Sequence, residues 1–144
     1  RFVTPALHRS LSLLSVVFVA IHVITTLADP YAAVSALATV LPFARAANAL
    51  WIGFGAVSLD LILALIVTSL LRRRLGYRVW RLTHWAAYLS WPVAFAHSVG
   101  MGSDAPSLWF RLLALGCLAA VIAATAARVL LHRPGKRLEP QVVT

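Results

Sequence analysis

Four of the five histidines lie in apolar stretches of the sequence. They are His8, His22, His84 and His97, and the last two bracket the segment HWAAYLSWPVAFAH. Each imidazole has two ring nitrogens that bind protons, hydrogen-bond partners or metals. An imidazole in apolar surroundings costs free energy unless something binds it. These positions therefore indicate sites at which histidine holds a partner.

On a straight helix, the spacing of the histidines puts one pair on a shared face and separates the other pair. His8 and His22 are 14 residues apart, which on a helix is about 21 Å of rise and within about 40° of one face. His84 and His97 are 13 residues apart, which on a straight helix separates them by about 140°. Pro92 lies between them and prolines distort helices. We expect this distortion to turn both imidazoles toward the first helix.

The elements that position these residues are membrane helices. The chain is 61% hydrophobic and 12% charged, with a mean hydropathy of +0.86, whereas a soluble domain is about half apolar and a quarter charged. A bilayer core about 30 Å thick needs about 20 apolar residues in a helix. We predict an all-α, integral membrane four-helix bundle in residues 1–131, with a short interfacial helix within 31–41 and a polar tail at 132–144. The four spans are expected at about 5–27, 47–71, 78–99 and 106–131.

The basic residues predict the orientation of the spans. With four spans, both termini and the basic turn between spans two and three lie on one side, which then holds eleven basic residues against two, Arg45 and Arg111, on the other. The positive-inside rule places the richer side in the cytoplasm. This distribution accounts for the net charge of +9, so we expect no nucleic-acid partner. The eleven are Arg1, Arg9, Arg72, Arg73, Arg74, Arg78, Arg81, Arg128, Arg133, Lys136 and Arg137.

The predicted topology pairs the histidines by depth. Spans one and three run in the same direction, so His8 and His84 lie near the cytoplasmic face, and His22 and His97 near the outer face. A zinc site would need three or four clustered ligands, whereas heme iron takes two axial ligands on one line. Two pairs at two depths therefore suggest two stacked hemes. The alternative is a heme-free transporter or assembly subunit that uses histidines as a proton relay.

Three stretches resemble a known family. They are LHRSLSLLSVVFVAIHV, LIVTSLLRRRLGYRVWRLTHWAAYLSWPVAFAH and GMGSDA. The sequence is similar to the ferric-reductase-like transmembrane domain family, the heme-bearing core of ferric reductases and NADPH oxidases, and most closely to a small actinobacterial branch. The resemblance implies that His8 and His84 ligate the iron of an inner heme b, and that His22 and His97 ligate the iron of an outer heme b.

The resemblance also implies electron transfer across a bacterial plasma membrane, from a cytoplasmic donor to an extracytoplasmic acceptor. Ferric reductases and NADPH oxidases carry a flavin and nicotinamide domain after this core, whereas here a short tail follows, without a glycine-rich phosphate loop. We therefore expect a separate donor, either a flavoprotein or a quinol; with a quinol, the chain is a cytochrome b subunit of a larger complex. Because the family core often has further helices upstream and the chain begins with Arg1, we also expect an upstream segment.

Several other residues are candidates for supporting roles. Arg9 and Arg81 adjoin the inner pair and are candidates to bind heme propionates, since Arg suits carboxylates; the competing interpretation is ordinary positive-inside topology. Asp60, near the middle of the second span, is a candidate for tuning a heme or for proton-linked chemistry. Trp91 is expected to pack against a porphyrin or a helix. We interpret His132 as a solvated residue at the end of the fourth span.

Overall fold

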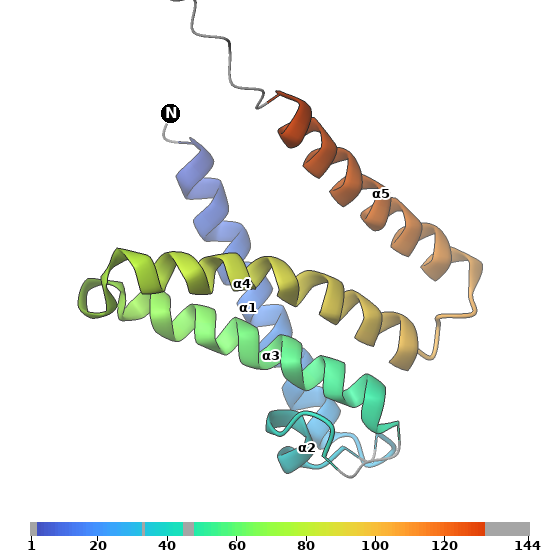
Figure 1. Ribbon diagram of the computed structural model, residues 1–144. Coiled ribbons are helices and arrows are strands. Elements are labelled where there is room, and N and C mark those ends of the chain that lie inside the picture. Colours follow the sequence, from blue (N-terminus) through green and yellow to red (C-terminus); the bar gives the residue numbers. More distant parts are fainter. Residues whose placement is uncertain (1–2, 33, 45–47, 132–144) are drawn as a thin grey trace, which may run out of the picture. The chain divides into compact units, whose positions relative to one another are not determined.

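The computed structural model describes residues 3–32, 34–44 and 48–131, and it is all-helical over these ranges (Figure 1). The predicted all-α membrane fold is confirmed. By contacts the chain divides into two units, residues 1–102 and 103–144. The predicted tail at 132–144, with His132, lies outside the described residues. The helices in chain order are α1 (Val3–Ala28), α2 (Ala36–Val40), α3 (Ala49–Leu70), α4 (Arg72–Met101) and α5 (Leu108–Leu131).

The first helix presents its apolar side chains outward. Leu7, Leu11 and Phe18 are each more than half exposed, as expected of a surface that faces lipid. The hydroxyl of Ser15 donates to the carbonyl of Leu11 within the same helix, so this polar group is satisfied without water. A turn follows α1, in which the Asp29 carboxylate accepts from the backbone N–H of Tyr31 at 2.9 Å.

A short helix is present in the segment where an interfacial helix is predicted, and it is shorter than predicted. Within the expected 31–41, α2 covers Ala36–Val40. Ser35 caps it, because its hydroxyl accepts from the N–H of Ala38 at 3.2 Å. The helix stops at Leu41, which is extended, as the residue before a proline tends to be. α2 packs against α3.

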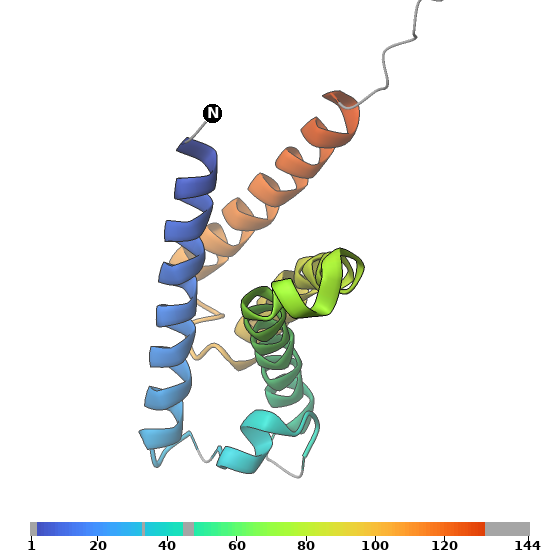
Figure 2. The same cartoon turned by 90° about the vertical axis from the view of Figure 1, so that its left-hand side faces the viewer.

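The antiparallel pair α3 and α4 is the best-packed part of residues 1–102 (Figures 1 and 2). On α3 the buried residues are small: Gly53, Ala56 and Ser58. Small residues let two helix backbones approach closely in a membrane. The Ser58 hydroxyl donates to the carbonyl of Ser90 on α4 at 3.2 Å, which joins the two helices by a hydrogen bond.

The predicted turn before the third span is present as a kink. The basic segment 72–78, expected to be a turn, contains a short helical stretch from Arg72 and then a break at Gly76, across which two helical segments join. Gly76 interrupts the helix with φ 75° and ψ 162°, a conformation that is essentially restricted to glycine. Arginine is a good helix former, so a run of basic residues does not by itself make a loop. The turn signal was therefore correct only at Gly76.

Among the described residues, three helices are long and apolar enough to cross a membrane: Pro5–Ala28, Ala49–Leu70 and Leu108–Leu130. The protein is therefore a multi-pass membrane protein. α4 is longer than any of them, but its N-terminal arginines make it less apolar. Its membrane crossing and the orientation of the spans stay predictions.

The second unit contains α5. The helix begins at Leu108, two residues later than predicted, because Ser107 forms its cap. The Ser107 hydroxyl donates to the Asp104 carbonyl at 2.6 Å and accepts from the N–H of Phe110 at 3.4 Å.

Candidate functional site: two histidine pairs

The structure brings the four membrane histidines together as two pairs. The ring centroids of His8 on α1 and His84 on α4 are 6.4 Å apart. Those of His22 on α1 and His97 on α4 are 6.2 Å apart. The ring planes meet at 63° in the first pair and 74° in the second. The pairs are those predicted from depth in the membrane.

Both α4 histidines lie beside α1 although they are 13 residues apart. The expected cause was a distortion at Pro92, but the break in α4 is at Gly76, and Pro92 keeps helical dihedral angles. In Figure 1, α1 crosses the direction of α4 instead of following it. When two helices cross, each lies on opposite sides of the other at its two ends. Ligands on different faces of α4 can therefore both reach α1.

The His97 ring contacts α3 through a hydrogen bond and a close approach to a glycine. Its Nδ1 is 2.8 Å from the main-chain carbonyl oxygen of Trp51. A carbonyl only accepts, so Nδ1 carries the proton and donates it. The neutral ring then has its lone pair on Nε2, the nitrogen available to a metal. The ring edge lies against Gly55, where a Cβ would be 2.7 Å from the Cε1 atom of His97.

The α3 partners of His97 were not predicted from the sequence. Neither Trp51 nor Gly55 is among the candidate residues that the sequence indicates. Their signal in the sequence is weak: Gly53 and Gly55 are two glycines in a mostly apolar helix, a pattern typical of close helix contact. Which side chain such a glycine admits depends on the facing helix, and local sequence does not encode that.

His84 has a different environment. It is half-buried, and its Nδ1 is buried with no hydrogen-bond partner among the described residues. The Trp80 ring lies one helical turn before it, with centroids 4.9 Å apart and planes tilted by 33°. The guanidinium of Arg72 lies 5.6 Å from the centroid of the Trp80 ring. The ring of His84 is therefore held by stacking, and one of its nitrogens lacks a partner within the described ranges.

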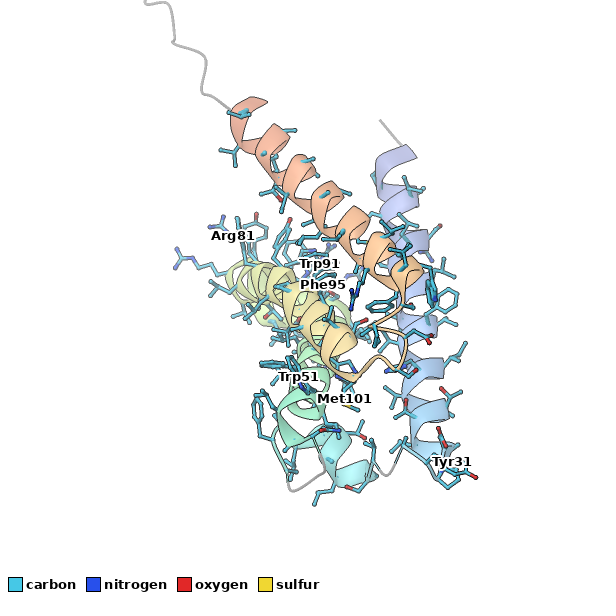
Figure 3. The ribbon with its side chains drawn as sticks, turned by 90° about the vertical axis from the view of Figure 1, so that its right-hand side faces the viewer. Tyr31, Trp51, Arg81, Trp91, Phe95 and Met101 are labelled. Atoms are coloured by element: carbon cyan, nitrogen blue, oxygen red, sulfur yellow. The ribbon has the colours of Figure 1, made fainter. Side chains whose placement is uncertain are left out.

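The other candidates lie on α1, α3 and α4. Arg9 and Arg81 are exposed, and the Arg81 guanidinium lies 5.7 Å from the ring centroid of Tyr77 (Figure 3). Asp60 is half-buried on α3. Trp91 stacks on Phe95 of the same helix, with centroids 5.3 Å apart and an angle of 21° (Figure 3).

Each pair offers two imidazoles. Within the described ranges no group of three or more His, Cys, Asp or Glu side chains is placed to hold a metal ion. Each pair therefore offers two candidate ligands, one imidazole from α1 and one from α4. Cys117 is exposed on α5 and belongs to the other unit.

Comparison with known proteins gives one match. The sequence model of the family described as "Ferric reductase like transmembrane component" matches residues 1–95. This range includes His8, His22 and His84, and ends two residues before His97. No curated protein and no solved structure matches the chain.

Proposed function

Because the chain belongs to the family of ferric-reductase-like transmembrane components, we propose that it carries electrons across the membrane through two b-type hemes. His8 and His84 hold the inner heme, and His22 and His97 hold the outer one. Membership of the family indicates transmembrane electron transfer in general. The heme count, the ligands, the direction and the partners are our proposal.

The observation that carries the proposal is the separation of the rings in each pair. Two metal–imidazole bonds of about 2 Å each, added to the distance from each ring nitrogen to its own centroid, give a centroid separation of about 6 Å. The two pairs have separations of 6.4 Å and 6.2 Å. Both values suit a metal between the two rings of a pair.

The chemistry of the four candidate ligands also suits heme iron. All four side chains are imidazoles, which are strong axial ligands of heme iron. The buried Nδ1 of His84 has no partner among the described residues, so a bound group that satisfied it would remove a desolvation cost. His97 is already in the tautomer that leaves Nε2 free. The residues present therefore suit two bis-imidazole sites.

When bound, each heme supplies a one-electron iron couple. With two imidazoles in each pair, such a group would be suited to electron transfer and not to oxygen activation. The apolar side chains of the helices would lower the dielectric around it. Arg9 and Arg81 are candidates to bind the propionates, since guanidinium groups pair with carboxylates. The protein thus supplies position, ligands and electrostatics.

We propose that electrons enter near His8 and His84 and leave near His22 and His97. The support is the charge asymmetry of eleven basic residues against two, from which the positive-inside rule predicts that the first pair lies near the cytoplasm. The donor is a separate flavoprotein or a quinol, and the acceptor is extracytoplasmic.

The first test is the reduced-minus-oxidised absorbance spectrum of the purified protein, with heme quantified per chain. We expect a b-type spectrum and two hemes. His22→Ala and His84→Ala should each remove one heme, because each takes one ligand from a different pair. His132→Ala is the control and should retain both.

Two outcomes would favour other functions. Colourless protein, prepared with heme supplied during expression, would contradict heme binding and favour the heme-free proton relay. Heme reduction by quinol, with no response to a flavoprotein donor, would favour a cytochrome b subunit of a larger complex.

A further inference from the structure

We propose that Gly55 and the Trp51 carbonyl position His97 as the ligand of the outer site. The inference rests on the proposed function and goes further by assigning roles to residues of α3, a helix that contributes no ligand. Gly55 provides the space in which the His97 ring lies against α3. The Trp51 carbonyl fixes which ring nitrogen is free.

The contact at Gly55 is close on one edge of the imidazole. A Cβ at this position would be 2.7 Å from Cε1, 2.8 Å from Nδ1 and 3.2 Å from Nε2 of His97. The first two distances are shorter than side chains tolerate, so a methyl group would push the ring away from α3. Both nitrogens of the ring would move with it.

The glycine at position 55 and the hydrogen bond to the Trp51 carbonyl act together on the His97 ring. The Trp51 carbonyl lies one helical turn before Gly55 on α3, so a side chain at position 55 would stand beside that carbonyl. With glycine there, Nδ1 approaches the oxygen to 2.8 Å. A ligating histidine whose other nitrogen donates to a carbonyl has a fixed orientation and a more basic ligand nitrogen.

The neighbouring glycines distinguish this role from ordinary helix packing. Gly100 on α4 leaves room for the Trp51 indole, and Gly53 on α3 leaves room for the ring of Phe43. A methyl group at either position would crowd that aromatic ring, whose atoms are its nearest neighbours, and not the imidazole of His97. Of the glycines on α3, Gly55 is the one that meets a proposed ligand.

The test compares Gly55→Ala with Gly53→Ala, which places the same methyl group on the same helix two residues away. We expect Gly55→Ala to change the electron paramagnetic resonance g-values of one of the two hemes, to raise its midpoint potential and to weaken its retention about ten- to a hundredfold. The potential should rise because a less basic imidazole stabilises oxidised iron less well. Gly53→Ala should lower thermal stability and leave both hemes unchanged.

A third variant separates the carbonyl from the side chain of Trp51. Trp51→Phe keeps the main-chain oxygen, so the hydrogen bond to His97 persists and both hemes should keep their g-values. If Gly55→Ala left both g-values and both potentials as in the unaltered protein, or if Gly53→Ala changed them equally, Gly55 would have no positioning role.

A measurement on the unaltered protein covers the case in which Gly55→Ala does not fold. In protein labelled with 15N-histidine and reduced, the ring N–H of His97 should exchange slowly with deuterium, because it is bonded to α3. Rapid exchange of every ring N–H would overturn the inference while two hemes remained bound. Absence of heme from the unaltered protein would instead overturn the proposed function, and this inference with it.

Discussion

The two proposed α4 ligands are held by different interactions. His97 donates a hydrogen bond to a carbonyl of another helix, whereas His84 stacks on Trp80 of its own helix and has an unpartnered Nδ1 among the described residues. A hydrogen bond fixes both the orientation and the tautomer of a histidine. Stacking fixes the plane of the ring and leaves the tautomer open. The two sites should therefore differ in how strongly they respond to loss of a neighbouring residue.

Trp80→Leu tests the stacking at the inner site. Without the indole 4.9 Å away, the His84 ring can rotate, so the g-values of one heme should change and its retention should fall by up to about tenfold. The measurement is electron paramagnetic resonance together with heme per chain. Trp85→Leu is the matched control, since Trp85 is exposed and contacts Tyr88. Equal effects of the two substitutions would show that the indole of Trp80 has no special role.

At the scale of the elements, Gly76 controls how α4 begins. Its φ of 75° and ψ of 162° lie in a region that costs other residues about 1–3 kcal/mol. A Cβ there would meet nothing within 4 Å, so the cost of Gly76→Ala is conformational alone. We expect a lower melting temperature in detergent, followed by circular dichroism.

Gly116→Ala is the matched control for this prediction. A Cβ at Gly116 would also meet nothing within 4 Å, but this residue lies within the regular helix α5, where alanine is favoured over glycine by about 0.5–1 kcal/mol. The two substitutions should therefore shift stability in opposite directions. If Gly76→Ala kept the melting temperature of the unaltered protein, glycine would not be required by the backbone at position 76.

The sequence predicted the helices better than their contacts. Apolar runs placed α1, α3 and α5 within a few residues, and depth in the membrane predicted which histidines pair. The spacing of His84 and His97 is a geometric problem that the sequence poses, and a distortion at Pro92 alone does not explain how both rings reach α1. Its resolution depends on how α1 crosses α4, and the contact at Gly55 depends on how α3 faces α4. Both are relations between distant segments, which local periodicity does not contain.

At the scale of the whole molecule, the depths of the two proposed sites depend on whether α4 crosses the membrane. Its N-terminal part carries Arg72, Arg73, Arg74, Arg78 and Arg81, and long basic side chains can extend to the headgroup region from a helix end. The remaining residues, 82–101, number 20, about 30 Å of helix and enough to cross a bilayer core. Both histidines of α4 lie in this part, so the two proposed sites are at different depths only if α4 crosses.

Cysteine labelling tests this crossing. In a Cys117→Ser background, which removes the one native cysteine, we expect Ser103→Cys to react with a membrane-impermeant maleimide in intact spheroplasts. Arg73→Cys should react only after permeabilisation, because four spans place the start of α4 in the cytoplasm and its end outside. Labelling of both from the same side would mean that α4 lies along the membrane surface. The two histidine pairs would then share one depth, and electron transfer from one face of the membrane to the other could not run through them.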